Sequence, residues 1–336
     1  MATDATLVPD APAVDGLHFR GILGQEDAIA LYDVHAGRAA RDGVDPSSTL
    51  EDWQSGDDLA MSLSQAMADG EQGQWLVAQI DDRVIGYSQI ECWFEDDGTW
   101  VYLITGWILP EWRSRGVGTA MLRWGESTAR RLAGKQHPGE HSEFAANASS
   151  TETDTTALLV HEGYRAMYTV LEMGLDISVP LSMSPVPAGI EVRPVLSAHC
   201  SLIAASIDES YRNEYDGSRF QEAFDPVDYA TRLGGPRHDP TLWQVAWDGD
   251  QVVGQVLSVI ENGRAEVFEV SVRPAWRQRG LARALLSRAL RSLRERGVDI
   301  IRLHTVAEFR TRATELYGSV GFRILKEFRR YRKPLV

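Results

Sequence analysis

Lysine is almost missing from this sequence, and nearly all of its basic residues are arginine. The chain has 336 residues and 34 lysines plus arginines, of which only Lys135, Lys326 and Lys333 are lysine. With 48 acidic residues, the formal net charge is −14. Because binding to phosphates needs a clustered surplus of base, this composition argues against a nucleic-acid partner.

Cysteine and long apolar runs are scarce too. Cys92 and Cys200 lie far apart, and neither they nor the eight histidines show the spacing of metal ligands. No run reaches the ~18 apolar residues that a membrane span requires. Residues 1–16 are acidic and contain proline, without the apolar core of a signal peptide. We therefore expect a cytoplasmic, soluble protein with no metal site and no membrane partner.

What the sequence does contain is an internal repeat. Residues 110–116 read PEWRSRG and residues 274–280 read PAWRQRG, which is five identities in seven positions at an offset of 164. Residues 75–86 match residues 243–254 in the same way, at an offset of 168. The chain therefore contains two diverged copies of one unit.

The length of the chain suits two domains of ~150 residues each. We predict a first domain at residues 16–173 and a second at residues 190–336. The segment 174–189 between them contains several prolines and serines and is predicted to be a linker.

Each copy is predicted to be an α/β unit, with a mostly antiparallel central sheet flanked by helices. In the second copy, Asp248-Gly-Asp250 between two β-rich runs is a hairpin signal, and Gly297 suits the end of a helix. The predicted strands of this copy are 244–247, 252–260, 266–272 and 300–303, and its predicted helices are 281–296 and 312–320.

A glycine-containing turn precedes the long helix of each copy. It reads Arg-x-x-Gly-x-Gly from Arg113 to Gly118, and Arg-x-x-Gly-x-Ala from Arg277 to Ala282. Amide N–H groups at a helix N-terminus have no helical acceptor, and a glycine lets a pyrophosphate approach them. The alternative is an arginine-rich surface loop that caps a helix. The presence of the motif in both copies favours a phosphate site.

On these motifs the chain resembles the GNAT superfamily of N-acetyltransferases, whose Q/R-x-x-G-x-G/A loop binds the pyrophosphate of coenzyme A. The resemblance covers nearly all of residues 18–173 and 190–336, and the doubled layout is similar to tandem GNAT proteins of actinobacteria. It implies that both copies bind acetyl-CoA or another acyl-CoA. The implied cofactor-binding residues are Gly106, Trp107, Ile108, Arg113, Ser114, Arg115, Gly116, Val117, Gly118 and Thr119 in the first copy, and Val270, Ser271, Val272, Arg277, Gln278, Arg279, Gly280, Leu281, Ala282 and Arg283 in the second.

The resemblance also implies which residue protonates the departing thiolate. Tyr317 lies four residues before Gly321, where GNAT enzymes usually have a catalytic tyrosine. The first copy has Leu159 at that position, and leucine cannot donate a proton. The alternative role for Tyr317 is that of a core residue of the last helix.

Two glutamates are candidates for the catalytic base. Glu266 lies eleven residues before Arg277, a spacing similar to that of the base in the histone-acetylating branch of the family; Tyr102 is its counterpart by sequence offset. Glu269 is the other candidate, and strand alternation predicts that it faces the opposite side of the sheet. Glu266 could equally be a solvated strand residue, because many relatives pass the proton through water.

The second copy departs from the family pattern at Arg310, where an asparagine commonly lies. We therefore predict a structural acyl-CoA site in the first copy and the catalytic site in the second. Residues 207–233 fall where GNAT helices line the acceptor cleft, although they also suit an ordinary amphipathic helix pair. The acidic and aromatic residues of this segment are Tyr211, Glu214, Tyr215, Asp216, Phe220, Phe224 and Asp225.

The function that the resemblance implies is acyl-CoA-dependent N-acetyltransfer to the amine of a small molecule. A non-catalytic acyl-CoA-binding protein stays open because of Arg310. A protein-lysine acetyltransferase also stays open, on Glu266 alone. The sequence determines neither the acceptor, nor the acyl chain, nor whether the protein is a homodimer.

Overall fold

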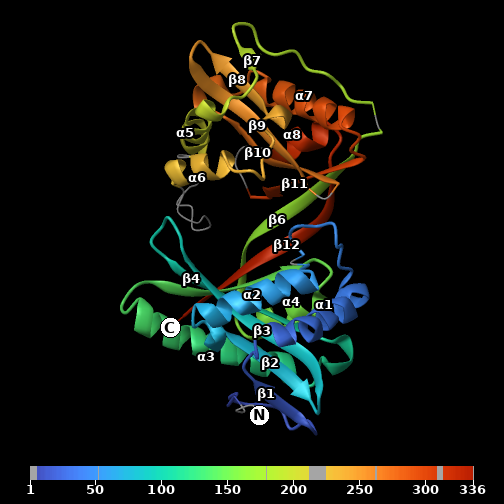
Figure 1. Ribbon diagram of the computed structural model, residues 1–336, viewed down its shortest axis with the longest axis vertical. Helices are drawn as coiled ribbons and strands as arrows, with labels where there is room; N and C mark the ends of the chain where they lie inside the picture. The colour runs from blue at the N-terminus through green and yellow to red at the C-terminus, as the bar shows by residue number, and fades with distance from the viewer. Residues whose placement is uncertain are drawn as a thin grey trace. The chain divides into compact units, whose positions relative to one another are not determined.

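The chain forms two compact units (Figure 1). The first comprises Met1–Tyr168 and Phe328–Val336, and the second comprises Thr169–Glu327. Within the described part of the chain, no helix is long and apolar enough to cross a membrane. The computed structural model describes residues 6–51, 53–178, 180–211, 225–261, 263–308 and 313–335.

The first unit is a mixed sheet with helices on both faces. Its strands, in sheet order, are β1 (Leu17–Arg20), β2 (Trp75–Ile80), β3 (Arg83–Phe94), β4 (Trp100–Ile108), β5 (Ser142–Ser149) and the Phe328–Pro334 part of β12 (Arg323–Pro334). Neighbours are antiparallel, except that β4 and β5 are parallel. The helices are α1 (Ala28–Asp42), α2 (Gly56–Ala68), α3 (Val117–Gln136) and α4 (Thr153–His161).

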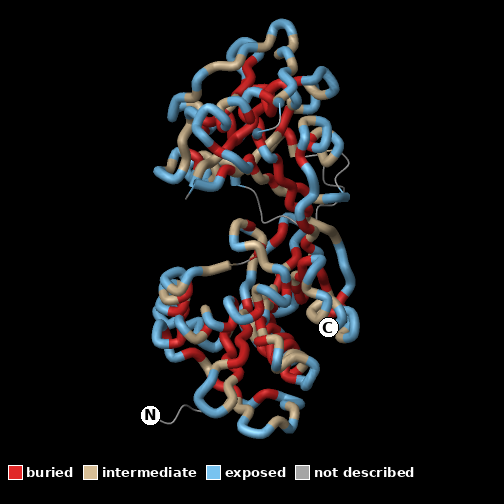
Figure 2. Tube along the Cα trace, turned by 90° about the vertical axis from the view of Figure 1, so that its right-hand side faces the viewer, coloured by how far each residue is buried: buried red, intermediate tan, exposed pale blue. Residues whose placement is uncertain are grey.

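Strand β2 shows why this sheet is covered on both sides. Trp75 and Val77 belong to the core that α1 and α2 form over one face, whereas Leu76 and Ala78 belong to the core under α3 on the other. Side chains alternate along a strand, so a continuous apolar run predicts burial on both faces. In Figure 2 the buried residues lie in the interior of each unit, with exposed residues around them.

The second unit repeats this plan. Its strands, in sheet order, are the Thr169–Asp176 part of β6 (Arg165–Asp176), β11 (Ile300–Val306), β10 (Arg264–Val272), β9 (Gln251–Glu261), β8 (Gln244–Asp248) and β7 (Glu191–Arg193). The helices are α5 (Cys200–Tyr211), α6 (Pro226–Leu233), α7 (Leu281–Glu295) and α8 (Ala313–Ser319). The predicted mixed α/β fold of two tandem units is confirmed, as are the predicted elements of the second copy.

Helix α7 follows directly from its sequence. Leu285, Ala289 and Leu293 recur at helical spacing and are completely buried in the core of the second unit. The helix ends before Gly297, whose φ of 77° is the left-handed conformation that glycine adopts readily after a helix.

Each unit includes the strand that ends the other repeat. In the first unit, β12 pairs with β5 from Phe328–Ser149 to Pro334–Glu143. In the second unit, β6 pairs antiparallel with all of β11. The compact units divide after Tyr168 and after Glu327, and residues 174–176 at the start of the predicted linker belong to β6.

Aromatic and charged side chains hold the Phe328–Pro334 part of β12 in the first unit. The Tyr331 ring is buried in that unit's core. Arg332 donates a hydrogen bond of 2.7 Å to Glu95, and both side chains are buried. Because a buried charge needs an opposite charge beside it, this pair ties the position of the strand to the first unit.

Candidate functional site

In both units the two central parallel strands separate partway along their length. The β4–β5 pairing ends at Leu103 and Ala145, although β4 continues to Ile108. The β10–β11 pairing ends in the same way at Val267 and Leu303. Beyond these points one edge of β4 and of β10 is free for hydrogen bonds to an extended ligand such as a pantetheine arm.

The glycine-containing turns have the same backbone conformation in both units. Ser114 and Gly116 have φ values of 57° and 83°, and Gln278 and Gly280 have φ values of 59° and 80°. Gly116 and Gly280 are the N-caps of α3 and α7. Left-handed residues next to a helix N-terminus direct several N–H groups towards one point, which is the geometry of an anion-binding nest.

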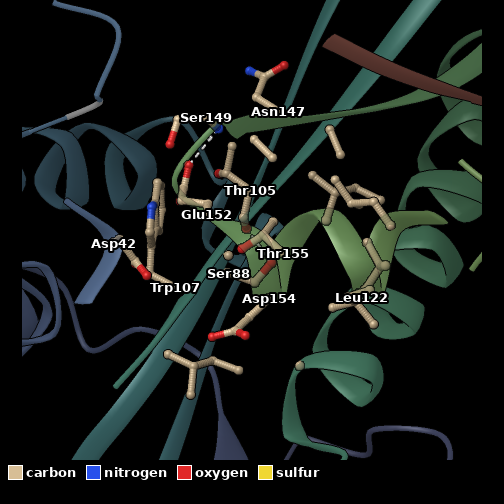
Figure 3. Close-up of a pocket in the computed structure, with 18 of the residues that line it drawn as sticks. Asp42, Ser88, Thr105, Trp107, Leu122, Asn147, Ser149, Glu152, Asp154 and Thr155 are labelled. Carbon is tan, nitrogen blue, oxygen red and sulfur yellow. Dashed lines mark hydrogen bonds between the residues drawn. The ribbon is translucent and has the colours of Figure 1, made fainter. Parts of the chain in front are cut away.

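A cavity of about 540 Å³ lies in the first unit, between the separated strands and the turn (Figure 3). This volume falls within the range typical of small-molecule sites. Arg115 and Val117 do not line it: the Arg115 guanidinium stacks 4.7 Å from the Trp112 ring, and Val117 is buried in the core. The other predicted cofactor residues of the first unit do line it: Gly106, Trp107, Ile108, Arg113, Ser114, Gly116, Gly118 and Thr119.

Arg113 braces the turn from within the protein. Its guanidinium donates to the Ile108 carbonyl at 3.1 Å, to both Asp42 carboxylate oxygens at 2.6 and 2.8 Å, and to Asp154 at 3.2 Å. Burial opposes ionisation of Asp42, but its contacts with Arg113 and Arg38 outweigh burial and lower its pKa. The guanidinium thus has several protein partners, and it holds the turn against α1 and α4.

The sequence analysis did not find the charged residues that line one side of this cavity. Arg38 and Asp42 lie one helical turn apart, which predicts an ion pair, but nothing local indicates their partners 71 or more residues away. Glu152 accepts from Arg38 at 3.2 Å and from the Ser149 N–H at 2.8 Å. Figure 3 shows Asp42, Ser149 and Glu152 on one side of the cavity, with Leu122 on the other.

Strand register identifies Leu103, rather than Tyr102, as the first-unit counterpart of Glu266. Strands β3 and β9 match at an offset of 168, so Glu91 corresponds to Val259. Glu91 pairs with Leu103, and Val259 pairs with Glu266. The assignment of Tyr102 from sequence offset is therefore wrong, because β10 contains a bulge that β4 lacks.

The first unit consequently has apolar groups where the second has ionisable ones. Leu103 and Leu159 both line the first-unit cavity, and they correspond to Glu266 and Tyr317. Neither leucine can exchange a proton. The cavity of the first unit can bind a ligand, but these two positions supply no acid or base.

The bulge in β10 also overturns a prediction about Glu269. The register shifts between Val267 and Glu269, so that Phe268 has no partner on β9. An extra residue reverses the alternation, and Glu269 lies on the same face of the sheet as Glu266 instead of the opposite face. The two carboxyl groups are thereby brought to one side, where the strands β10 and β11 separate.

Phenol groups surround Glu269. The Tyr211 hydroxyl on α5 donates to its carboxylate at 3.0 Å. Burial raises the pKa of Glu269 to about 7, although hydrogen bonds from Ser271 and Tyr211 oppose the rise. The charge of Glu269 contributes in turn to a raised pKa of Tyr229 on α6, after burial.

Tyr317 lies on α8 at the edge of the same cluster. Its ring is buried and packs edge-on against Phe322, with centroids 6.2 Å apart. Burial, followed by the charge of Glu269, raises the pKa of the Tyr317 phenol above its ordinary value. No hydrogen bond joins its hydroxyl to another described residue, so the proton remains available to a ligand.

Glu266, in contrast, is paired with a cation. Its carboxylate lies 3.1 Å from His304 Nδ1, and Glu172 lies 3.8 Å from His304 Nε2. Burial alone would lower the pKa of His304, but hydrogen bonds and charges from Glu172 and Glu266 raise it to about 9. His304 is therefore an imidazolium at neutral pH and holds Glu266 in an ion pair.

The predicted cofactor residues of the second unit divide into buried and exposed groups. Arg277 donates to the Val272 carbonyl at 2.8 Å, as Arg113 does to Ile108, and to the Ser210 carbonyl at 2.6 Å. Val272, Leu281 and Ser271 are buried, Val270 and Ala282 are half-buried, and Gln278, Arg279, Gly280 and Arg283 are exposed.

Part of the predicted acceptor region is outside the described residues. This applies to Glu214, Tyr215, Asp216, Phe220 and Phe224, and Arg310, where the family commonly has an asparagine, is outside the described residues as well. Of the described members, Tyr211 reaches Glu269, whereas the Asp225 side chain accepts from the Val227 N–H and caps α6. Tyr211 thus lies in the candidate site, and Asp225 has a structural role.

The model of the acetyltransferase (GNAT) family matches residues 42–137 and 204–322, which include both turns, strand β4, and the separated strands β10 and β11. The chain belongs to the GNAT family. It is therefore an N-acetyltransferase, and GNAT acetyltransferases take their acyl group from an acyl-CoA.

Relatives match along most of the chain. A mycothiol acetyltransferase of Nocardia farcinica is 26% identical over 312 residues, covering 89% of this chain and 92% of its own. A mycothiol acetyltransferase of Kineococcus radiotolerans is 30% identical over 257 residues, covering 74% and 78%.

Solved structures support the tandem fold. A GCN5-related N-acetyltransferase from Sphaerobacter thermophilus has a TM-score of 0.76 at 21% identity and covers 98% of this chain and 97% of its own. A tandem GNAT protein from the clavulanic acid biosynthesis pathway has a TM-score of 0.65 at 14% identity, covering 95% and 99%. At these identities the likeness concerns the fold alone, and in both cases it extends over two GNAT units.

Proposed function

We propose that the second unit transfers the acyl group of acetyl-CoA to the amine of a small molecule, and that Tyr317 protonates the departing thiolate. The observation that carries this proposal is the placement of Tyr317: its hydroxyl has no partner among the described residues, and it lies in the electrostatic reach of Glu269. The mycothiol acetyltransferase relatives support a small amine as acceptor.

The residues of the second unit suit each part of such a reaction. The edge of β10 at Val270–Val272, which has no strand partner beyond the end of its pairing with β11, would pair with the pantetheine arm through the groups that Arg277 and Tyr211 leave open. The N–H groups of Gln278–Arg283 would bind the pyrophosphate. A carboxylate would take the proton that the amine loses. A buried phenol with a raised pKa remains protonated at neutral pH and can give its proton to the thiolate.

Tyr317→Phe tests this assignment. The substitution keeps the ring and its packing against Phe322 but removes the proton donor. We expect kcat to fall by roughly 10²-fold, while the affinity for acetyl-CoA changes by no more than a few-fold. Turnover is followed by loss of thioester absorbance with acetyl-CoA and a panel of amines comprising glucosamine, tyramine, lysine ethyl ester and spermidine.

The matched control is Tyr164→Phe, because Tyr164 is a buried tyrosine of the first unit at the position that corresponds to Phe322. This variant should keep full activity. An unchanged kcat in Tyr317→Phe, with chemistry rate-limiting, would move the proton donor elsewhere. Loss of folding in Tyr317→Phe would favour the core role.

We further propose that the first unit binds an acyl-CoA without turning it over. The cavity of about 540 Å³ beside the turn at Gly116 supports binding, and the leucines at positions 103 and 159 argue against chemistry. A ligand held only by the folded state stabilises that state by mass action, by ~2.7 kcal/mol at a concentration one hundred times its Kd.

Gly116→Asp tests the site in the first unit. Its carboxylate would repel the pyrophosphate, so native mass spectrometry should show loss of a tightly held acyl-CoA, and the melting temperature should fall by roughly 5–10 °C. Gly280→Asp is the matched control, since Gly280 has nearly the same φ, and it should keep the ligand. Loss of the ligand in Gly280→Asp alone would reverse the assignment.

A further inference from the structure

We propose that Glu269, rather than Glu266, takes the proton from the acceptor amine, and that Tyr211 positions its carboxylate. The proposal rests on the proposed function, because it concerns acyl transfer in the second unit. It goes beyond that function in assigning the base, and in assigning a positioning role to a residue of α5.

The bulge at Phe268 places Glu269 on the reactive face of the sheet. By strand register, the first-unit counterpart of Glu269 is Thr105, since Gln89 pairs with Thr105 and Leu257 pairs with Glu269. Thr105 lines the first-unit cavity and is seen there in Figure 3. The same strand position in the second unit therefore faces the space where the acyl donor would lie.

The groups that face Glu269 come from three helices. Tyr211 of α5 donates to it at 3.0 Å, and Tyr229 of α6 and Tyr317 of α8 both lie in the reach of its charge. Its neighbour on the same strand face, Glu266, is paired with His304. The described surroundings thus contain one phenol that donates to Glu269, two further phenols within reach of its charge, and a cation that binds the competing glutamate.

These environments separate the two carboxyl groups chemically. Glu266 already has a cation partner, because its carboxylate lies 3.1 Å from the ring of His304. Glu269 has neutral donors and a pKa raised by burial to about 7, near the optimum for a base at neutral pH. Of the two carboxyl groups on this face, Glu269 is the one whose hydrogen-bond donors are neutral, and it is the one available to accept the proton.

The proton balance of the step is complete with Glu269 and Tyr317. The amine nitrogen forms a bond to the thioester carbon and loses a proton to the Glu269 carboxylate, directly or through a water. The carbon–sulfur bond breaks, and the sulfur takes a proton from Tyr317. Transfer of the proton from Glu269 to the Tyr317 phenolate then restores both residues, and the products are an amide and the free thiol.

The test is the pH dependence of kcat/KM with acetyl-CoA and the fastest amine of the panel. In the unsubstituted protein the rate should fall as pH drops through about 7, because Glu269 becomes protonated. In Glu269→Gln, kcat should fall by roughly 10²-fold, and the decrease of kcat/KM on the acid side of the pH profile (the acid limb) should disappear. The affinity for acetyl-CoA should not change. Glu266→Gln should keep the limb, and the exposed Glu261→Gln should behave like the unsubstituted protein.

Tyr211→Phe provides a readout that a merely structural role would not move. Loss of its hydrogen bond should raise the pKa of Glu269, so that the acid limb moves to higher pH by roughly 0.7 units. The same profile is measured with a second panel amine of different pKa. If the acid limb belongs to Glu269, it lies at the same pH with both amines, whereas a limb caused by titration of the acceptor would move with the pKa of the amine. Because Tyr211→Phe retains Glu269, its pH profile still tests the proposal if Glu269→Gln does not fold.

Three outcomes would overturn the inference. They are full activity in Glu269→Gln, loss of the acid limb in Glu266→Gln, and an acid limb that Tyr211→Phe leaves in place. If Tyr317→Phe is inactive while Glu269→Gln is active, the assignment of the base alone is wrong. If both variants are fully active, the proposed function of the second unit is wrong as well.

Discussion

At the scale of single residues, the two motif arginines act inside the protein. Arg113 and Arg277 each donate to a carbonyl five residues earlier, which closes the turn between strand and helix. Sequence reasoning placed these cations beside a pyrophosphate, because an arginine next to a glycine-rich turn suggests that role. The partner Asp42 lies 71 residues before Arg113, a distance at which the sequence carries no signal.

Arg113→Ala should therefore destabilise the first unit. It leaves the Asp42 carboxylate, which is 3% exposed, with one cation fewer. Breaking a buried pair costs ~3–5 kcal/mol, so calorimetry should show a fall in melting temperature of roughly 6–20 °C. Arg115→Ala is the matched control two residues away, and it should change the melting temperature by only a degree or two. Equal effects of the two variants would contradict this account.

At the scale of strands and helices, the sequence predicted what is local and periodic. Apolar runs and helical spacing located the strands and α7, and Gly297 marked the end of that helix. The bulge at Phe268 has no comparable signal, since Glu266–Val272 reads as an ordinary strand. One inserted residue reverses which side chains face the site, so the error about Glu269 followed from a single irregularity in hydrogen bonding.

The contacts of His304 join three neighbouring strands, and they should make the stability of the second unit depend on pH. The folded-state pKa of about 9 is above the ordinary value of 6.5. The resulting stabilisation, about 3 kcal/mol, is thus fully present below pH 6.5 and is lost as pH rises through about 9.

Calorimetry between pH 6 and pH 10 measures this effect against His304→Gln, which keeps a hydrogen-bonding side chain but does not titrate. The melting temperature of the unsubstituted protein should exceed that of the variant at pH 6, and the two curves should approach each other as the pH passes about 9. Parallel curves over the whole range would show that His304 carries no such charge in the folded state.

At the scale of the whole molecule, the two repeats are bound together by exchanged strands. Nothing in the sequence of β12 predicts which unit it completes, because its few apolar residues follow no regular alternation that would identify a partner strand. The choice depends on long-range contacts such as the Arg332–Glu95 pair. The repeat was therefore predictable from the sequence, whereas the composition of each unit was not.

A chain of residues 1–173 should accordingly fail to fold alone, because it lacks the strand Phe328–Pro334. A synthetic peptide of residues 323–335 should restore a cooperative melting transition and binding of acetyl-CoA when added in excess. The control is the same peptide with Tyr331→Asp. It should restore neither the transition nor the binding, since the aspartate would place a charge in the core of the first unit. Cooperative melting of residues 1–173 without any peptide would contradict the exchange.

The exchange of strands has a consequence for the order of events during synthesis. Domains usually fold as soon as they leave the ribosome, but the first unit must wait for β12, which follows about 160 residues after Tyr168. At ~5–20 residues per second, this delay is roughly 8–32 s. Throughout it, the edge of β5 has no β12 partner and is open to the strands of other nascent chains. Slow translation should therefore promote misfolding and aggregation of the first unit more than of the second, although most of the first unit is synthesised earlier.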